Sequence, residues 1–394
     1  MKKYVLFVIS AVCVMLCGCF TAIDETPPWE SGSVPAIVSL ETEKIVMETL
    51  TETETELPQE IPDPAEEILT AMSIEEKIGQ VILARYPNDP AEQAGEYHFG
   101  GYTLYSEDFE KETPESLSEK LAGINSASGI PLFFAADEEG GWVVRISCYP
   151  AFAERSLPSV QKTLSEGGEI SAWTDELADN LQRAGINLNL APVADVAESK
   201  DDYIYKRTCG LEYEETGEVI AEIVNNMNRR GIVSCLKHFP GYGSNVDTHT
   251  GIAVDSRTAE SFENGDFIPF LRGIEAGSPM IMVNHNIIEA YDPKVPASLS
   301  PEVHNVLREL GFEGIIISDD LGMDAISLYT NDPYSEAFLA GNDLLCASDG
   351  AACHKALYEA FQNGAFTEER LNESVLRIIR TKLEYGIIVG SPRG

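Results

Sequence analysis

The sequence is poor in positive charge. Its 394 residues include 27 Lys and Arg against 65 Asp and Glu, which gives a formal net charge of −38 and an isoelectric point near 4.3. A surface that binds nucleic acid needs clustered Lys and Arg to neutralise phosphates, so this composition argues against a nucleic-acid-binding protein. The same negative charge would repel an anionic membrane surface. Any attachment to a membrane must therefore be covalent or apolar.

Cysteine pairs with the spacing of metal ligands are also lacking. Three of the eight cysteines fall within residues 1–19, and the other five are scattered without a Cys-x-x-Cys pair: Cys148, Cys209, Cys235, Cys346 and Cys353. This spacing argues against a zinc site. An odd number of cysteines after residue 19 excludes a fully paired disulfide framework, so we predict that most of the five are buried as small apolar residues. We expect no metal and no other cofactor.

Residues 1–19 have the pattern of an export signal. Two lysines precede an apolar run, and no positively charged stop-transfer cluster follows that run. The run ends in Leu16-Cys17-Gly18-Cys19, which resembles a bacterial lipobox in which Cys19 would carry the lipid and become the mature N-terminus. A plain transmembrane anchor and an ordinary cleaved signal are the alternatives. We predict a lipoprotein signal peptide over 1–19 and a protein anchored by lipid to the outer face of a bacterial cell membrane.

Residues 20–65 are rich in Thr, Glu, Pro and Ser, as in METLTETETELPQEIPDPAEE. Low hydrophobicity with dense negative charge cannot offset the entropy cost of ordering a chain. We therefore predict a disordered acidic spacer over 20–65, which would hold the next domain away from a lipid anchor. Apolar residues first recur at helical spacing in EEILTAMSIEEKIGQ, and we place the folded domain at 66–394.

Eight apolar runs alternate with amphipathic segments in this domain. The runs are QVILARY, FGGYTLYS, IPLFFAADEEGG, INLNLAPVADV, GIVSCLKHFPG, SPMIMVNHNII, GIIISDDLGM and NDLLCASDG. Among the segments between them are TGEVIAEIVNNMNRRG and PEVHNVLRELG, each ending in the glycine expected after a helix. Alternating strands and helices indicate a parallel sheet of βα units. Eight such units over roughly 320 residues favour a single (β/α)8 TIM-type barrel over an open, doubly wound sheet.

Most of these runs end in charged or amide side chains. In a barrel, the carboxyl ends of all strands face one mouth, where active sites are built. The fold would therefore bring together groups that are far apart in the sequence: Arg85, Asp137 and Glu138, Asp195, Lys237 and His238, Asn284 and His285, and Asp319 and Asp320.

Two short stretches carry groups suited to acid–base or nucleophilic chemistry. In IIISDD, Asp319 continues the strand and can act as nucleophile, general base or metal ligand, whereas Asp320 suits the cap of the next helix or a structural partner. In VDTHTG, Asp247 and His249 lie two apart, so their side chains share one face of an extended segment. An Asp beside a His can fix the imidazole tautomer and provide a general acid or base near neutral pH.

Five motifs, in their order along the chain, resemble those of glycoside hydrolase family 3 in its bacterial β-N-acetylglucosaminidase branch: AADEEGGWVVR, INLNLAPVADV, KRTCG, KHFPGYGSNVDTH and GFEGIIISDDLGM. The likeness runs from about Met72 to Ile387. It implies retaining hydrolysis of a terminal β-linked N-acetylglucosamine. Asp319 matches the nucleophile that forms a glycosyl-enzyme intermediate, and His249 matches the acid/base of this branch with Asp247 as its orienting partner.

The resemblance also implies a set of residues that hold the hydroxyls and the acetamido group of the sugar. Asp and Arg suit this task because they form paired, directional hydrogen bonds. The matching positions are Asp137, Arg145, Arg207, Lys237 and His238.

Four features depart from the usual pattern of the family that this chain resembles. Many members take a second carboxylate from a domain beyond the barrel, but this chain stops at Gly394, just after the eighth βα unit. We expect the His–Asp dyad to supply the proton instead. Tyr242 replaces the usual His of a Pro-Gly-His-Gly motif, and the following loop is about one residue short. Trp142 replaces the first Arg of the usual EGGRVQR, which we expect to change the mouth near Arg145.

Three functional interpretations follow. The first is an exported β-N-acetylglucosaminidase that acts on cell-wall fragments, because peptidoglycan is the abundant source of this sugar outside a bacterial membrane. The second is another family 3 β-glycosidase of the β-glucosidase type. The third is a saccharide-binding surface lipoprotein without turnover, against which the complete set of candidate catalytic and binding residues argues. We expect a monomer whose partner is the saccharide. Whether water or phosphate accepts the sugar, and whether Arg85 or His285 contacts it, is left open.

Overall fold

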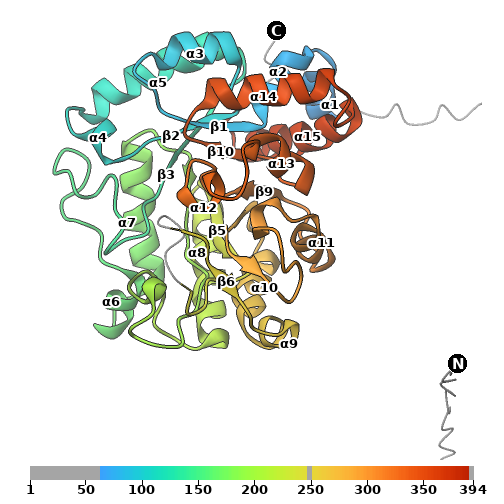
Figure 1. Ribbon diagram of the computed structural model, residues 1–394. Helices are drawn as coiled ribbons and strands as arrows, with labels where there is room; N and C mark the ends of the chain where they lie inside the picture. Colours follow the sequence, from blue (N-terminus) through green and yellow to red (C-terminus); the bar gives the residue numbers. More distant parts are fainter. Residues whose placement is uncertain (1–62, 246–250, 390–394) are drawn as a thin grey trace, which may run out of the picture. The chain divides into compact units, whose positions relative to one another are not determined.

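The computed structural model describes residues 63–245 and 251–389. Eight parallel strands pair in the order β10-β1-β2-β3-β4-β5-β7-β9, and a parallel bridge between Ile317 and Leu344 brings β9 against β10 to close the barrel (Figure 1). The strands are β1 (Ile82–Arg85), β2 (Gly101–Thr103), β3 (Phe133–Ala136), β4 (Leu188–Asn189), β5 (Val233–Phe239), β7 (Met280–Val283), β9 (Ile315–Ser318) and β10 (Leu345–Ala347). Each predicted apolar run contains one of them. The predicted (β/α)8 barrel is confirmed.

Helices follow the strands and cover the outside of the barrel (Figure 1). They are α1 (Pro64–Thr70), α2 (Ile74–Gln80), α3 (Pro90–Tyr97), α4 (Ser106–Phe109), α5 (Pro114–Ser128), α6 (Val160–Ser165), α7 (Ile170–Arg183), α8 (Tyr213–Arg229), α9 (Ala259–Ser261), α10 (Phe267–Glu275), α11 (Pro301–Glu309), α12 (Asp324–Ser327), α13 (Pro333–Ala340), α14 (Gly350–Gln362) and α15 (Glu368–Glu384). Short helical turns are η1 (Tyr203–Arg207), η2 (Phe262–Asp266) and η3 (Ala297–Leu299).

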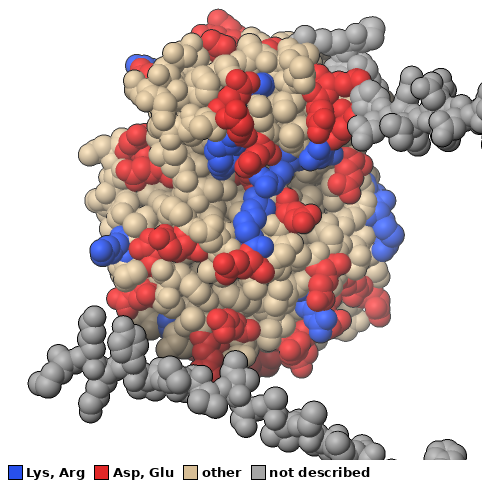
Figure 2. Space-filling view, turned by 90° about the vertical axis from the view of Figure 1, so that its right-hand side faces the viewer, with Lys and Arg blue, Asp and Glu red and all other residues tan. Residues whose placement is uncertain are grey.

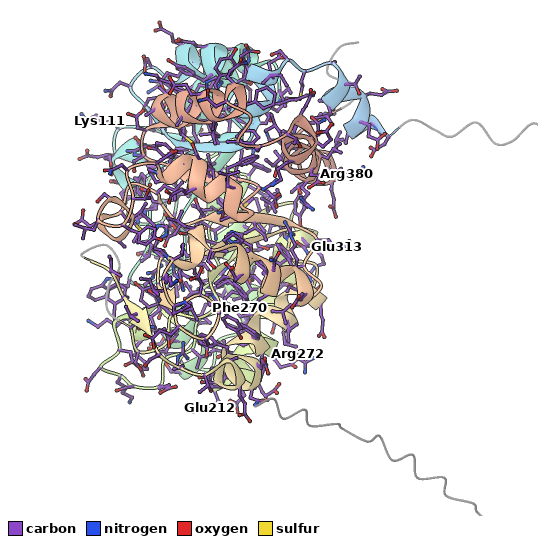
Figure 3. The ribbon with its side chains drawn as sticks, turned by 45° about the vertical axis from the view of Figure 1, so that its right-hand side comes forward. Lys111, Glu212, Phe270, Arg272, Glu313 and Arg380 are labelled. Atoms are coloured by element: carbon purple, nitrogen blue, oxygen red, sulfur yellow. The ribbon has the colours of Figure 1, made fainter. Side chains whose placement is uncertain are left out.

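Side chains of the helices and of the strands form the core between the two layers. All residues of β7 and β9 are buried, because the helices cover one face of the sheet and side chains fill the barrel interior on the other. Phe270 of α10 packs edge-on against Phe239 of β5, with ring centres 5.3 Å apart. Figure 3 shows Phe270 inside the molecule, while Arg272, Glu313 and Arg380 lie at its periphery. Because both faces of these strands are buried, their sequences are apolar throughout and do not alternate between apolar and polar residues.

Arginines hold the strand ends on the side of the barrel opposite to the mouth. Asp343, just before β10, is buried and accepts hydrogen bonds from Arg308 at 2.6 Å and Arg377 at 3.0 Å. Arg308 also donates to the carbonyl oxygens of Phe312 and Gly314, which precede β9. Figure 2 shows Lys and Arg side chains gathered in a stripe on one face and flanked by Asp and Glu. The Asp343 cluster links neighbouring strands and serves the stability of the fold.

A small two-stranded sheet lies after β5, formed by β6 (Val254–Asp255) and β8 (Ile287–Ile288). Asp255 accepts a hydrogen bond from Asn245 at 2.7 Å and is paired with Arg257, which also binds Asp266 at 2.7 Å. Gly241 makes room for this cluster, since a Cβ there would lie 2.1 Å from the Asp266 carboxylate. The cluster therefore fixes the described residues on both sides of 246–250.

Several predictions concern residues that lie outside the described ranges, namely the signal peptide, Cys19 and most of the spacer. Helix α1 begins at Pro64, two positions before the predicted start of the barrel domain, and Asp63 caps it. Within the described part of the chain, no helix is both long and apolar enough to span a bilayer. The five cysteines there are free, and all but Cys148 are buried, as predicted for most of them.

Candidate active site

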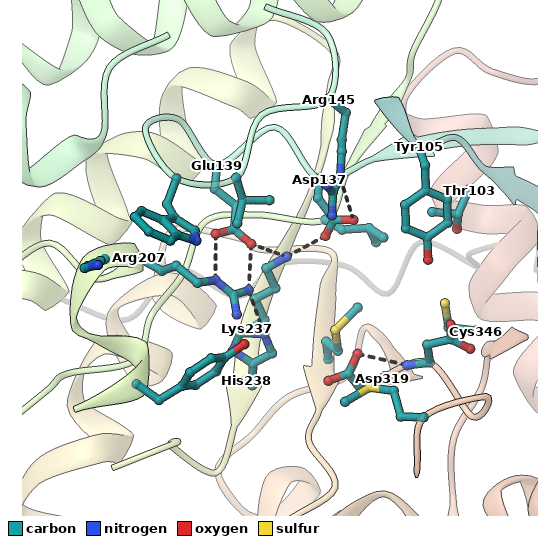
Figure 4. A pocket seen from close by; sticks show the side chains of 18 of the residues that line it. Thr103, Tyr105, Asp137, Glu139, Arg145, Arg207, Lys237, His238, Asp319 and Cys346 are labelled. Atoms are coloured by element: carbon teal, nitrogen blue, oxygen red, sulfur yellow. Dashed lines mark hydrogen bonds and ion pairs between the residues drawn. The ribbon is translucent and has the colours of Figure 1, made fainter. Parts of the chain in front are cut away.

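A pocket of about 730 Å³ lies at the carboxyl ends of the strands (Figure 4). Its lining comes from β2, β5, β7 and β10 and from the segments that follow β2, β3, β4 and β9. Among the lining residues are Asp319 and all five predicted sugar-binding residues, Asp137, Arg145, Arg207, Lys237 and His238. The structure thus brings together groups that lie up to 182 positions apart in the sequence, between Asp137 and Asp319.

Lys237, from β5, lies at the centre of a buried network of charges. Its ammonium group is 2.6 Å from an oxygen of Asp137 and 2.7 Å from an oxygen of Glu139. Both Glu139 oxygens accept hydrogen bonds from the Arg207 guanidinium, at 2.8 and 2.9 Å. Two cations therefore face two carboxylates. The side chains of Lys237 and Glu139 are only 2% and 3% exposed, so water screens this pairing little.

The network keeps Glu139 and Lys237 charged. Burial alone would raise the pKa of Glu139, but Arg207 and Lys237 outweigh burial and hold this pKa well below its ordinary value. Burial would likewise lower the pKa of Lys237, yet Asp137 and Glu139 raise it above its ordinary value. Because each charge is compensated before any ligand arrives, the network can present fixed hydrogen-bond donors and acceptors to the pocket without reorganising.

Arg145 and Tyr105 form the wall beside Asp137. The Nε atom of Arg145 lies 3.9 Å from Asp137 Oδ2, and its guanidinium packs 5.4 Å from the centre of the Tyr105 ring. Arg85 packs on the same ring at 4.6 Å. Burial raises the pKa of Tyr105 well above its usual range, so the hydroxyl stays protonated. Figure 4 shows this hydroxyl directed into the pocket, where it can donate or accept a hydrogen bond.

His238 is fixed by partners on both ring nitrogens. Its Nδ1 lies 2.6 Å from Asp195 Oδ2, and its Nε2 lies 3.2 Å from the Arg207 Nη2 atom. Because a guanidinium group can only donate, Nε2 accepts this bond, and the ring proton is on Nδ1 and is donated to Asp195. The other oxygen of Asp195 accepts the backbone N–H of Tyr242 at 2.8 Å. Asp195 therefore orients His238 from behind without lining the pocket itself.

Asp319 directly follows β9 and faces the network across the pocket (Figure 4). Its backbone N–H donates to the carbonyl oxygen of Val283 on β7 at 3.0 Å, which continues the ladder of the sheet. One carboxylate oxygen accepts the backbone N–H of Asp320 at 2.8 Å. The strand thus delivers a carboxylate to the mouth, as predicted.

The predicted helix cap by Asp320 is wrong. Helix α12 begins at Asp324, and the residue at its N-cap position is Met323. Asp320 instead accepts the backbone N–H of Gly322 at 2.9 Å and the Ser348 hydroxyl at 2.7 Å, which ties the end of β9 to the segment after β10. A turn between the strand and the helix moves the cap position three residues along. The alternative role of a structural partner is the one that the structure shows.

Not every polar strand end reaches the pocket. Glu138 is fully buried and accepts the backbone N–H groups of Arg145 and Ile146 at 2.7 and 2.8 Å, so it shapes the loop after β3. His285 is buried between the Ser298 hydroxyl and the carbonyl oxygen of Asp320 and does not line the pocket. The same holds for Asn284, and for Arg85, which binds Asp108 and Glu107. These groups support the site from behind.

Sequence reasoning missed Glu139, the residue that pairs with both Lys237 and Arg207. Three acidic residues follow β3 in a row, and successive side chains of an extended chain point to opposite sides, so residues 137 and 139 share the side of the pocket. This alternation was the available signal. The predicted dyad of Asp247 and His249 lies outside the described residues.

Replacing Glu139 by Gln should lower the free energy of unfolding by about 3–5 kcal/mol, because it leaves buried cations without their compensating charge. Ionised Glu139 stabilises the fold above pH 4.5, its ordinary pKa, and this contribution is lost as the pH falls toward the lower pKa of the folded state. In urea unfolding, the difference in free energy of unfolding between the wild type and Glu139→Gln should therefore be smaller at acidic pH than at neutral pH. Glu154→Gln at an exposed position is the matched control. A difference that does not vary with pH would contradict the argument.

Comparisons with known proteins agree with this geometry. The family described as "Glycosyl hydrolase family 3 N terminal domain" matches residues 73–381. "Beta-hexosaminidase A" of Pseudoalteromonas piscicida is 30% identical over 339 residues, which cover 77% of this chain and 56% of the relative. "Beta-hexosaminidase" of Nitrosomonas eutropha is 34% identical over 244 residues, or 58% of this chain and 67% of the relative. This chain thus spans little more than half the length of the first of these relatives.

Solved structures share the fold over most of the chain. A glycoside hydrolase family 3 beta-N-acetylglucosaminidase from Paenibacillus superposes with a TM-score of 0.75 at 26% identity, covering 81% of this chain and 64% of the other. The protein LpqI of M tuberculosis superposes with a TM-score of 0.73 at 25% identity, covering 82% of this chain and 96% of the other. With the family match spanning most of the barrel, the chain belongs to glycosyl hydrolase family 3.

Proposed function

We propose that this protein is a retaining glycoside hydrolase that removes terminal β-linked N-acetylglucosamine from cell-wall fragments. One observation carries the proposal: Asp319 lines the same pocket as the charged network around Lys237. The names of the relatives and of the structural neighbour from Paenibacillus support the choice of sugar. Retaining hydrolysis needs a nucleophilic carboxylate beside the anomeric carbon. The charged network provides side chains that can hold the sugar in that position.

The proposed reaction has two steps. In the first, the Asp319 carboxylate attacks the anomeric carbon, while His249, oriented by Asp247, donates a proton to the oxygen of the leaving group. A covalent ester between the sugar and Asp319 results, and the glycosidic bond is broken. In the second step, His249 takes a proton from water, whose oxygen displaces Asp319 from the anomeric carbon. Two successive inversions give net retention, so the product first formed is the β-anomer.

The network would hold the sugar during both steps. Asp137 accepts hydrogen bonds from sugar hydroxyls, and Arg145, Arg207 and Lys237 donate to the hydroxyl and acetamido oxygens. His238, locked by Asp195, completes this wall. Because these side chains are held by one another before substrate arrives, little binding energy is lost in ordering them.

A panel of 4-nitrophenyl glycosides tests this function. We expect turnover of the β-N-acetylglucosaminide, with the β-anomer released first in nuclear magnetic resonance spectra. Turnover of the β-glucoside alone would favour the second interpretation. A saccharide that binds in calorimetry but is never cleaved would favour the binding protein.

Addition of phosphate distinguishes hydrolysis from phosphorolysis, because phosphorolysis releases a sugar phosphate. Digestion of muropeptides followed by mass analysis identifies the sugar released from the natural class of substrate.

We also propose that the protein is exported and carries a lipid on Cys19. The support is the sequence pattern of residues 1–19, which lie outside the described residues. A lipid at the N-terminus and a peptidoglycan-derived substrate would place enzyme and substrate in the same compartment. Labelled fatty acid should enter the full-length protein and not its Cys19→Ser variant; equal labelling of the two would refute the anchor.

A further inference from the structure

Trp142 stands at the rim of the pocket with most of its indole in solvent. Its side chain lines the pocket, yet the residue is 68% exposed. Single exposed apolar residues are common on protein surfaces. Trp142 differs from such residues because it lies next to a charged network that is almost fully buried. Tryptophan also contributes much of the binding energy at sites where a ligand or partner covers it.

The position of Trp142 is fixed by a tight turn after β3. The backbone N–H of Glu139 donates to the carbonyl oxygen of Val143 at 3.0 Å, and Gly140 pairs with Val143 in an antiparallel bridge. Gly140 and Gly141 have φ of 81° and 68°, in the left-handed region that favours glycine. A Cβ at Gly141 would lie 2.5 Å from the Cβ of Ser159, so the turn packs closely on the loop before α6. Glu139 points into the network from one end of this turn, and Trp142 follows at the other.

Two neighbouring residues of η1 hold the same turn at both ends. Arg207 binds Glu139 in the buried network, and Lys206 places its ammonium group 4.1 Å from the centre of the Trp142 ring. Lys206 therefore covers part of the indole through a cation–π contact, and the residue as a whole stays 68% exposed, which leaves surface that a ligand can cover. The rim and the inner pocket are thus linked through adjacent residues of one helical turn. The indole thus has a protein partner before any ligand binds.

We propose that Trp142, backed by Lys206, is a stacking surface for the first sugar ring of the leaving group, and so selects oligosaccharides over small aglycones. This inference rests on the proposed function. The terminal sugar that reacts must lie in the inner pocket beside Asp319, so the next ring of the chain extends toward the rim. A β-linked pyranose presents a face of C–H groups, which packs on an aromatic ring and excludes water from it. Binding energy gained at this ring, away from the reacting bond, can accelerate the cleavage step.

Leaving groups of two kinds test the proposal. In Trp142→Ala, kcat/KM for N,N′-diacetylchitobiose should fall about tenfold, while kcat/KM for the methyl β-N-acetylglucosaminide should change by less than about twofold. Trp142→Phe, which keeps an aromatic face, should retain most of the activity on the disaccharide. An equal loss on both substrates, or no loss on the disaccharide, would overturn the stacking surface and leave the hydrolase standing. A wild-type protein that cleaves neither substrate would instead count against the proposed function.

Fluorescence supplies a readout that does not depend on turnover. The chain has three tryptophans, and Trp173 is buried, with its indole N–H donating to the carbonyl oxygen of Pro158 at 2.7 Å. Titration with a sulfur-linked diacetylchitobiose, which resists hydrolysis, should give a saturable change in wild-type emission that Trp142→Phe lacks. The same change in both proteins would show that the ligand does not cover Trp142 and would overturn the proposal.

Discussion

Replacing Asp319 by Asn should lower kcat/KM on 4-nitrophenyl β-N-acetylglucosaminide by at least about 10³-fold, as is typical when a catalytic nucleophile is removed. The amide has the size of the carboxylate, and its oxygen can still accept the backbone N–H of Asp320, so the fold and the pocket should be preserved. It cannot form the covalent ester with the sugar. The loss should appear in kcat, because the attack is made only in the transition state.

Asp320→Asn is the matched control for this experiment. Its carboxylate is adjacent in sequence and also lines the pocket, but it is used in hydrogen bonds with Gly322 and Ser348 that an amide oxygen can in part replace. We expect a loss of less than about tenfold, together with a lower unfolding temperature. If the Asp320 variant were inactive and the Asp319 variant active, the assignment of the nucleophile would have to be reversed. Unfolding curves of both variants show whether a loss of activity reflects loss of the fold.

His249→Ala should lose about 10²- to 10⁴-fold in kcat/KM on a substrate with a poorly acidic leaving group such as a second sugar. On a dinitrophenyl glycoside the loss should be less than about tenfold, because this leaving group departs as a stable anion and needs no proton. The ratio of the two losses measures the acid role directly. The acid role of His249 rests on the match of its motif to the family, since residues 246–250 lie outside the described ranges.

Two comparisons make this result specific. Asp247→Asn should show the same dependence on the leaving group with a smaller amplitude, since Asp247 acts only through the imidazole. Asp319→Asn should lose activity on both substrates alike, since both need the nucleophile. Equal losses of the His249 variant on good and poor leaving groups would remove His249 from the acid role, and the protein would then need another proton donor.

Local pattern was enough to predict the barrel and the carboxylate that follows its seventh strand. Runs such as GIIISDD are apolar because helices cover one side of each strand and the barrel interior fills the other. Because both faces of a strand are covered, every residue along it is apolar, and this pattern is visible in a short stretch of sequence. The same continuity places Asp319 one position beyond β9, at the mouth. Turn geometry is less regular, which is why the cap expected at Asp320 fell instead at Met323.

The sequence by itself determined the (β/α)8 architecture, the family and the set of polar groups at the strand ends. Only the tertiary structure decided which of these groups face the pocket and with which partner. Lys237 pairs with Asp137 across 100 positions, Arg207 binds Glu139 across 68, and Glu138 between the two acids turns away to bind the loop. No periodicity of the chain encodes such pairs, because they depend on how distant strands and loops meet in space. The exposure of Trp142 was settled in the same way, by a turn held between a buried ion pair and Lys206.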